Sequence, residues 1–275
     1  WRSTQLSGGA SATVLGPSGV GPSGVRWSVC IRLRPIMAKI RLFIDHPLAE
    51  GQGVELNPDQ AHYLSSVMRQ GAGDEILVFN GRDGEWLARI ERIAKRNGAL
   101  AALRRTAPQL NPPDLWLVFA PIKKARTDFI VEKAAEMGAA RILPVQTDHT
   151  NSERIRQDRL QAHAVEAAEQ CGGTFVPEVG DLVPLSRLLD GWDAGRRILW
   201  ADEALAGPAQ VLSGLPRGPW AILIGPEGGW SESERKRLAA MDCVTPVALG
   251  PRILRADTAA VASLALWQAA LGDWR

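Results

Sequence analysis

The sequence is poor in the residues on which several protein classes depend. Its three cysteines, Cys30, Cys171 and Cys243, are far apart and outside any C-x-x-C pair, so neither a disulfide framework nor a zinc site is indicated. A reducing, cytoplasmic compartment suits such a chain. The uncharged run at 258–272 is shorter than the roughly 20 apolar residues that span a bilayer, so we expect no membrane segment.

Several catalytic motifs are also missing. The sequence contains no H-E-x-x-H, no G-x-S-x-G, no G-x-G-x-x-G and no Walker phosphate loop. We therefore expect no metal, and the missing glycine fingerprint disfavours a nicotinamide-dependent enzyme. The 32 basic and 30 acidic residues leave a net charge of only +2. Any argument for a nucleic-acid partner must therefore rest on local charge.

Length and composition predict a globular chain of two domains behind an N-terminal extension. Of the 275 residues, 45% are hydrophobic and 23% charged, which is enough for more than one core. Residues 1–36 differ, because they hold six glycines, six serines, three prolines and no acidic residue. Such a segment buries too little apolar surface to offset its ordering entropy, so we expect disorder there and a fold that begins near Met37.

Residues 37–107 predict a small β module. Asn57, Pro58 and Gln60 indicate a helix start, with Asn as N-cap, Pro at N1 and Gln at N3. Strands separated by glycine-containing turns are expected at 40–44, 76–79, 86–93 and 100–103. The last three would form an antiparallel meander, which closes with the first strand into a small barrel.

Positive charge gathers on one hairpin of this module. Six cations lie there against Glu91 alone: Arg89, Arg92, Lys95, Arg96, Arg104 and Arg105. Lys and Arg on edge strands can simply block aggregation, whereas small barrels with basic loops recur as oligonucleotide binders. Because the cations accompany a barrel pattern, we favour RNA binding.

The remaining chain predicts a second, α/β domain. Prolines in 108–114 indicate a linker, and residues 115–275 then alternate strand and helix. We expect strands at 115–119, 142–145, 198–201, 220–224 and 244–249, and helices at 127–137, 152–170, 232–241 and 257–271. This order predicts a mostly parallel sheet with helices on both faces, and ligands bind such sheets at the carboxyl ends of the strands.

The loop at 225–229, Gly-Pro-Glu-Gly-Gly, follows one of these strands. Ser231 and Glu234 form a capping box after it, so the next helix start is well specified. One glycine would suffice for a tight turn. Three glycines in five positions indicate a backbone that approaches a ligand closely.

The loop at 249–258 follows the next strand and carries Arg252, Arg255 and Asp257 in front of an alanine-rich helix. Charges of this kind could merely pair at the surface. Next to the glycine loop, they instead indicate one binding site built from two strand ends.

With these motifs, the sequence resembles the bacterial methyltransferases that act on N3 of a uridine in 16S ribosomal RNA, members of the knotted SPOUT class. The resemblance rests on His62–Arg69, Lys123–Gly138, Glu169–Gly172, Ile224–Gly229 and Leu249–Arg255. Three positions depart from the family pattern. Gly173 stands in place of the usual arginine, Asp257 in place of glutamate, and Trp230 in place of phenylalanine.

The resemblance implies a PUA-like RNA-binding β-barrel at 37–107 and a knotted, parallel-sheet SPOUT methyltransferase domain at 115–275. It also implies S-adenosylmethionine (SAM) as cofactor, the RNA of the small ribosomal subunit as partner, and a homodimer with no membrane attachment. The implied cofactor-binding residues are Ile224, Gly225, Pro226, Glu227, Gly228, Gly229, Leu249, Gly250, Ile253, Leu254, Arg255 and Thr258. The RNA-binding residues are Arg41, Arg69, Arg89, Arg92, Lys95, Arg96, Lys123, Arg126 and Lys133.

The chemistry of this reaction needs few catalytic groups. A sulfonium methyl is already activated, so alignment can supply up to about 7–11 kcal/mol of the barrier without a metal or a covalent nucleophile. N3 of uracil must lose its proton, however. Arg255 is our candidate for stabilising the developing negative charge, and Glu227 and Asp257 are alternative proton acceptors.

Two other functions stay open. One is a SPOUT methyltransferase that acts on another RNA site. The other is a non-catalytic RNA-binding or ribosome-assembly protein, which the basic hairpin and Gly173 would suit.

Overall fold

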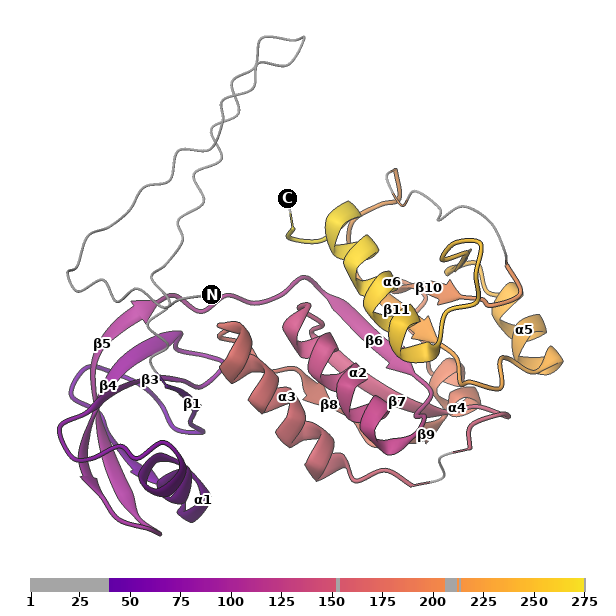
Figure 1. Cartoon of the computed structure of the whole chain (residues 1–275). Helices are drawn as coiled ribbons and strands as arrows, with labels where there is room; N and C mark the ends of the chain where they lie inside the picture. The colour runs from indigo at the N-terminus through magenta and orange to yellow at the C-terminus, as the bar shows by residue number, and fades with distance from the viewer. Residues whose placement is uncertain (1–39, 152–153, 206–211, 213, 275) are drawn as a thin grey trace, which may run out of the picture. The chain divides into compact units, whose positions relative to one another are not determined.

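Figure 1 shows the computed structural model of the chain, which describes residues 40–151, 154–205, 212 and 214–274. The disorder expected for 1–36 lies outside the described residues. Two sheets organise the described chain. A five-stranded sheet forms before residue 108, and a seven-stranded sheet forms after residue 114.

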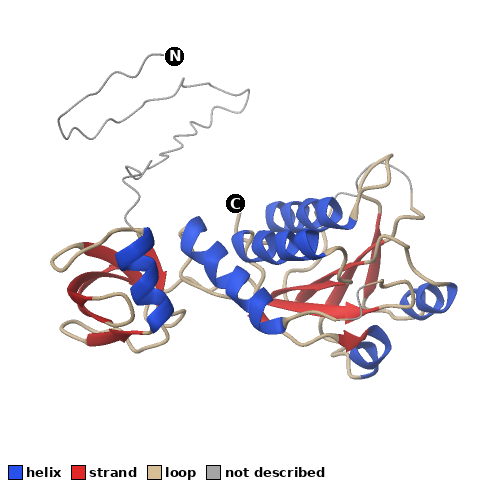
Figure 2. Ribbon diagram, turned by 60° about the horizontal axis from the view of Figure 1, so that its bottom comes forward, coloured by secondary structure: helices blue, strands red, loops and turns tan. Residues whose placement is uncertain are grey.

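The first sheet has the strand order β1-β3-β4-β5-β2. Its strands are β1 (Arg41–Phe43), β2 (Gly53–Leu56), β3 (Glu75–Phe79), β4 (Glu85–Ile93) and β5 (Gly98–Ala107). The expected meander of β3, β4 and β5 is confirmed, while β1 joins β3 in parallel. The sequence did not predict β2, a short strand that pairs with β5. In the described residues β1 and β2 are the two edges and do not pair, so the sheet curls without closing by hydrogen bonds (Figure 2).

The helix of this module begins where the sequence predicts. The Asn57 side chain accepts a hydrogen bond from the Gln60 backbone N–H at 2.8 Å, and the Gln60 side chain accepts one from the Asn57 N–H at 3.0 Å. This capping box starts α1 (Pro58–His62), which continues as the π-helical turn η1 (Tyr63–Val67). Arg69 follows with φ of 55°, the single positive φ outside glycine among the described residues. Its side chain is exposed.

The second sheet has the strand order β12-β10-β11-β6-β7-β8, and β9 pairs with β7. All its pairs are parallel, as predicted. Its strands are β6 (Leu115–Phe119), β7 (Arg141–Gln146), β8 (Glu178–Val179), β9 (Val183–Pro184), β10 (Arg197–Ala201), β11 (Trp220–Ile224) and β12 (Val244–Val247). The helices are α2 (Lys124–Glu136), α3 (Gln157–Cys171), α4 (Leu185–Asp190), α5 (Glu232–Ala239) and α6 (Ala256–Ala270).

Several elements of this domain differ from the sequence-based expectation. Helix α2 begins three residues earlier, and α3 begins five residues later than predicted. Strands β8 and β9 and helix α4 were not predicted. Each of these is six residues or shorter, so it carries too little periodicity to be found in a single sequence.

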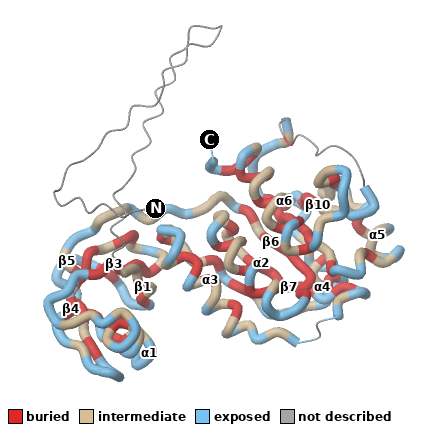
Figure 3. The backbone as a smooth tube through the Cα atoms, viewed as in Figure 1, coloured by how far each residue is buried: buried red, intermediate tan, exposed pale blue. Residues whose placement is uncertain are grey.

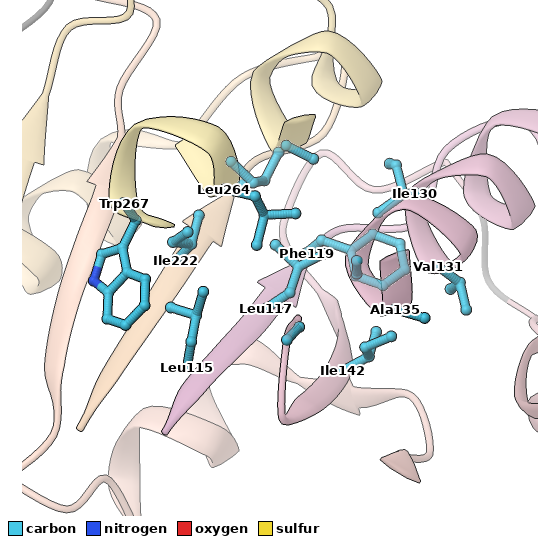
Figure 4. Close-up of a cluster of buried hydrophobic side chains, with 14 of the residues drawn as sticks. Leu115, Leu117, Phe119, Ile130, Val131, Ala135, Ile142, Ile222, Leu264 and Trp267 are labelled. Atoms are coloured by element: carbon cyan, nitrogen blue, oxygen red, sulfur yellow. The ribbon is translucent and has the colours of Figure 1, made fainter. Parts of the chain in front are cut away.

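Buried side chains lie on both faces of the second sheet, and Figure 3 shows the backbone coloured by how far each residue is buried. Leu115, Leu117 and Phe119 of β6 pack with α2, α3 and α6, and part of this cluster is drawn in Figure 4. Val118, Leu223 and Trp200 pack on the other face, near α4 and α5. Burial on both faces explains the uninterrupted apolar runs of β6 and β11. The prediction of helices on both faces is confirmed.

Candidate functional site

The loop after β11 is shaped by packing within the chain. A Cβ atom added to Gly225 would lie 2.8 Å from the Trp230 ring, and one added to Gly229 would overlap the Glu203 carboxylate. Gly229 also has φ of 71°, a conformation that costs other residues about 1–2 kcal/mol. These contacts account for the glycines without a ligand. Any role of the loop in binding therefore rests on the cavity beside it.

The capping box after this loop is confirmed. The Ser231 side chain accepts a hydrogen bond from the Glu234 backbone N–H, and the Glu234 carboxylate accepts one from the Ser231 N–H at 2.9 Å. Trp230 is buried and donates its indole N–H to the Ala201 carbonyl at 3.2 Å. The ring thereby holds the loop against the end of β10.

The loop after β12 leaves its polar backbone available. Among the described residues, no hydrogen bond is recorded for the backbone of residues 249–254. The side chain of Ile253 is 81% exposed. Arg255 is the N-cap of α6 but makes no capping hydrogen bond, so its guanidinium is not engaged at the helix start.

A cavity of about 320 Å³ lies between these two loops and the end of β10. Ten predicted cofactor-binding residues line it: Ile224, Gly225, Pro226, Glu227, Gly229, Leu249, Gly250, Ile253, Leu254 and Arg255. Gly228 and Thr258 do not. Gly228 packs against His149, and the Thr258 side chain is exposed at the first turn of α6. The two loops therefore form one concave site at the carboxyl edge of the parallel sheet, where the ends of β11 and β12 lie on either side of the end of β10.

Sequence reasoning did not identify the third wall of the cavity. Asp202 and Glu203, directly after β10, line it and pair with Arg235 of α5. Glu203 also accepts a hydrogen bond from the Trp230 backbone N–H at 3.3 Å. The signal was available, because two carboxylates stand at the end of a strand predicted to lie in the parallel sheet.

A charged cluster stands beside the cavity. Nη1 of Arg126 lies 2.8 Å from the Glu227 carboxylate, and its Nε lies 3.7 Å from Asp257. Arg126 comes from the first turns of α2, whereas Glu227 and Asp257 come from the two loops at the ends of β11 and β12. Among these three, only Glu227 lines the cavity. The structure thus joins two predicted catalytic carboxylates to a cation predicted to bind RNA.

Arg255 differs from Arg126 in having no ion-pair partner among the described residues, although its side chain lines the same cavity. An unpaired guanidinium next to a concave site is able to stabilise negative charge on a bound group. The cavity therefore brings together three paired carboxylates, of Asp202, Glu203 and Glu227, and two arginines, Arg252 and Arg255, that have no ion-pair partner among the described residues.

The structure corrects one predicted RNA contact, Arg41. Its guanidinium is almost wholly buried and donates to Glu85 at 2.9 Å and to the carbonyls of Ala168, Glu169 and Gly173 at 2.7–2.9 Å. All three nitrogens are satisfied within the chain. Arg41 therefore links β1 to the C-terminal end of α3 and is not available to a phosphate.

Burial near the contact between β1 and α3 also shifts the pKa of Glu169. Desolvation raises the pKa of its carboxyl, while a hydrogen bond from the Phe43 backbone N–H, 2.8 Å away, opposes the rise. The carbonyl of Gly173 accepts from Arg41, so the position that departs from the family pattern still contributes to this contact through its backbone.

Some of the other predicted RNA-binding cations form ion pairs within the chain. Arg89 and Arg92 form exposed ion pairs with Glu75 and Glu55, and Lys133 pairs with Glu136. Ion pairs at this exposure are typically worth less than about 1 kcal/mol and are easily exchanged for a phosphate. Four cations are exposed and have no ion-pair partner among the described residues: Arg69, Lys95, Arg96 and Lys123. The basic hairpin therefore keeps free positive charge at its turn.

Two features are absent from the described residues. No helix there is both long and apolar enough to cross a membrane. No group of three or more His, Cys, Asp or Glu side chains in the same residues is placed to hold a metal ion.

The comparisons with known proteins agree with this arrangement. The model of an RNA methyltransferase domain matches residues 109–268, and that of an RNA methyltransferase PUA domain matches 56–102. A Rickettsia conorii protein named ribosomal RNA small subunit methyltransferase E is 30% identical over 82% of this chain and 93% of its own length. Its namesake from Bacillus subtilis is 27% identical over 82% of this chain and 94% of its own length.

Solved structures are similar over the same range. A ribosomal RNA small subunit methyltransferase E from Neisseria gonorrhoeae, solved with S-adenosyl methionine bound, has a TM-score of 0.76 and 28% identity, over 86% of this chain and all of the other. A Legionella pneumophila structure that contains the cofactor SAM has a TM-score of 0.77 and 29% identity, over 86% of this chain and 99% of the other.

Fold and cavity together define a SPOUT-type methyltransferase, a parallel α/β domain that follows a PUA-like β module. The chain belongs to the RNA methyltransferase family whose domain model covers more than half of it.

Proposed function

We propose that this protein transfers a methyl group from SAM to N3 of a uridine in the 16S RNA of the small ribosomal subunit. The single observation that carries the proposal is the cavity between the β11 and β12 loops, which places carboxylates and the guanidinium of Arg255, unpaired within the described residues, around one concave space. The matching relatives are named as small-subunit RNA methyltransferases, and two neighbours contain SAM.

The residues of the cavity fit SAM. Ile224, Leu249 and Leu254 offer an apolar surface to a purine, and the unpaired backbone of 249–254 offers donors and acceptors for its edge. Asp202 and Glu203 supply acceptors for ribose hydroxyls on the opposite wall. Once bound, the sulfonium supplies an activated methyl group. The chain would hold it through the predicted loop residues that line the cavity, with Gly228 and Thr258 supporting the loops from outside.

The charged groups have separate roles in the methyl transfer. Arg255 stabilises the negative charge that develops on the uracil when N3 loses its proton. Glu227 lines the cavity and is better placed than Asp257 to accept that proton. Arg126 pairs with both carboxylates and fixes their positions relative to each other. Its role thus becomes positioning of these carboxylates, besides any contact with phosphate.

RNA would be held mainly by exposed cations. Lys123 lies next to the cavity at the start of α2, and Lys95 and Arg96 lie at the turn of the basic hairpin. Arg69, in its left-handed conformation at the end of η1, is a further contact. We propose that the protein acts in the cytoplasm as a homodimer, in which the exposed Ile253 is covered by the second subunit.

A direct assay tests the function. The full chain is incubated with isotopically labelled SAM and 16S RNA, or with small subunits, and the RNA nucleosides are identified by mass spectrometry. We expect label in 3-methyluridine. Label in another nucleoside would show that the protein methylates a different RNA site. Absence of label from both substrates, with RNA still bound, would favour the non-catalytic alternative.

The cavity itself is tested by filling it. Ala259 of α6 lines the cavity and is 8% exposed, so Ala259→Phe would project a ring into the space proposed for SAM. A ring in this space would block contacts that SAM makes there, so we expect a loss of SAM affinity of at least about tenfold, or about 1.4 kcal/mol, in calorimetric titration.

Ala269→Phe provides the matched control for this substitution. Ala269 lies on the same helix but is exposed and away from the cavity, so SAM affinity should not change. The thermal unfolding midpoint without SAM shows whether each variant is folded. A folded Ala259→Phe variant with unchanged SAM affinity would place the cofactor elsewhere.

A further inference from the structure

A second cleft, of about 290 Å³, lies between the N-terminal ends of α2 and α3. It shares no lining residue with the cavity between the β11 and β12 loops. Both helices follow strands of the parallel sheet, β6 and β7, so the cleft lies along the same carboxyl edge as the cavity. Figure 1 shows α2 and α3 side by side, in agreement with their contacts.

The charge of this cleft is predominantly positive. Four cations line it, Lys124, Arg154, Arg156 and Arg159, against the single carboxylate of Asp128. Ile122, Ile155 and Leu160 supply its apolar part. Like charges around one concave surface repel one another, so this arrangement does not by itself stabilise the fold.

Two of these cations are neutralised within the chain. Arg159 pairs with Asp128, a carboxylate that is 7% exposed, and Arg156 pairs with Asp158 at 2.6 Å. Lys124 and Arg154 are exposed and have no ion-pair partner among the described residues. Within the described part of the chain, the cleft therefore presents two positive charges without an ion-pair partner.

The backbone adds to this charge. Neither Lys123, the N-cap of α2, nor Arg156, the N-cap of α3, forms a side-chain capping bond. The partial positive ends of both helices border the cleft, since Lys124 and Arg156 line it. This contribution supports the side chains and would not define a site without them.

We propose that this cleft binds a backbone phosphate of the substrate RNA, next to the nucleotide that enters the methyl-transfer cavity. The inference rests on the proposed function and deepens it. Lys124 and Arg154 contact the phosphate, and Arg159 is held in place by Asp128. Arg126 lies two residues after Lys124 and pairs with Glu227 at the cavity. An RNA strand whose base occupies the cavity therefore passes the start of α2 on its way to the cleft.

The test compares full-length variants in RNA binding and in turnover. Lys124→Gln and Arg154→Gln, singly and together, remove charge from the cleft. Arg187→Gln is the matched control, because Arg187 is exposed on α4 at the opposite face of the sheet and has no ion-pair partner among the described residues. Affinity for 16S RNA is measured from about 50 mM to about 400 mM salt.

Loss of one phosphate contact predicts a specific change. The slope of log affinity against log salt should become shallower by about 0.7, with affinity about fivefold weaker near 0.1 M salt. The rate at saturating RNA and the SAM affinity should stay as in the unmodified chain. The Arg187→Gln variant should match the unmodified chain in all three measurements.

Three outcomes would overturn the proposal. An unchanged salt slope in the folded double variant would show that the cleft meets no phosphate. An equal loss in Arg187→Gln would show a general charge effect. Loss of the dimer by the double variant in a sedimentation experiment would indicate that the cleft contacts the second subunit and not the RNA. Failure of the proposed function can be distinguished from these outcomes. It would appear as absence of methyl transfer by the unmodified chain, whereas the slope of log affinity against log salt is measured from RNA binding alone.

Discussion

Replacing Arg41 by alanine is expected to lower the free energy of unfolding by about 3–5 kcal/mol, the largest effect that we predict. This is the usual result of removing one partner from a buried ion pair. The side chains of Arg41 and Glu85 are only 11% and 5% exposed. The substitution would leave Glu85 as an uncompensated buried carboxylate, with one oxygen still accepting from Thr106 at 2.8 Å.

The loss would extend to helix α3. The carbonyls of Ala168, Glu169 and Gly173 would lose the guanidinium that satisfies them at the C-terminal end of the helix. Urea unfolding of the full chain measures the change. Arg92→Ala is the control, because its ion pair with Glu55 is 2.7 Å long but 57% and 69% exposed, and its removal should cost less than about 1 kcal/mol.

The same variant decides between two interpretations of Arg41. The sequence assigns it to RNA, whereas the structure assigns it to the contact between β1 and α3. If Arg41→Ala kept its unfolding midpoint and lost RNA affinity, Arg41 would bind RNA and would not stabilise the contact between β1 and α3. We expect the opposite result.

Replacing Arg255 by alanine is expected to lower kcat by about 10²–10³-fold, the range found when a donor to a developing anion is removed. Arg255 lines the cavity without an ion-pair partner among the described residues, so its charge is available to the uracil. Single-turnover methyl transfer at saturating RNA and SAM measures the effect separately from binding. Arg255→Lys should recover part of the rate, because it keeps the charge but not the planar fork.

Arg252→Ala is the matched control for this prediction. Arg252 also lines the cavity, comes from the same loop and is exposed, but it precedes the helix by several residues and is not our candidate for the anion. We expect its kcat to stay within about threefold of the unmodified chain. A similar loss in both variants would indicate that the loop's total charge matters, and unchanged kcat in Arg255→Ala would remove this residue from the mechanism.

Much of the second domain could be predicted from local pattern. The run Trp220–Ile224 is buried at every position, and it forms β11 with the predicted bounds. The two capping boxes, at Asn57 and Ser231, form as expected because all their atoms lie within four consecutive residues. The placement of the two loops at one edge also followed, since the parallel strands of one sheet all end at the same edge, although β10 lies between β11 and β12.

Other features could not be predicted in this way. The glycines at 225 and 229 suggested a close ligand, yet their immediate neighbours are Trp230 and Glu203, and the latter comes from another strand. Strand β2 was missed because four residues that begin with a glycine are too short for their alternation to stand out in a single sequence. The two carboxylates after β10 could be recognised as lying at a strand end, but their place between the loops after β11 and β12 depends on the strand order, which no local pattern gives.

The sequence by itself determined the succession of elements, the two loops at the strand ends and the family to which their motifs point, because these depend on neighbouring residues and on period. Only the tertiary structure decided what each charge does. Arg41 is buried against carbonyls more than 120 residues away, and Arg126 meets a carboxylate 101 residues further along the chain. The effect of an ionic group depends on its partners and its solvation, and both are set by the folding of distant segments against it.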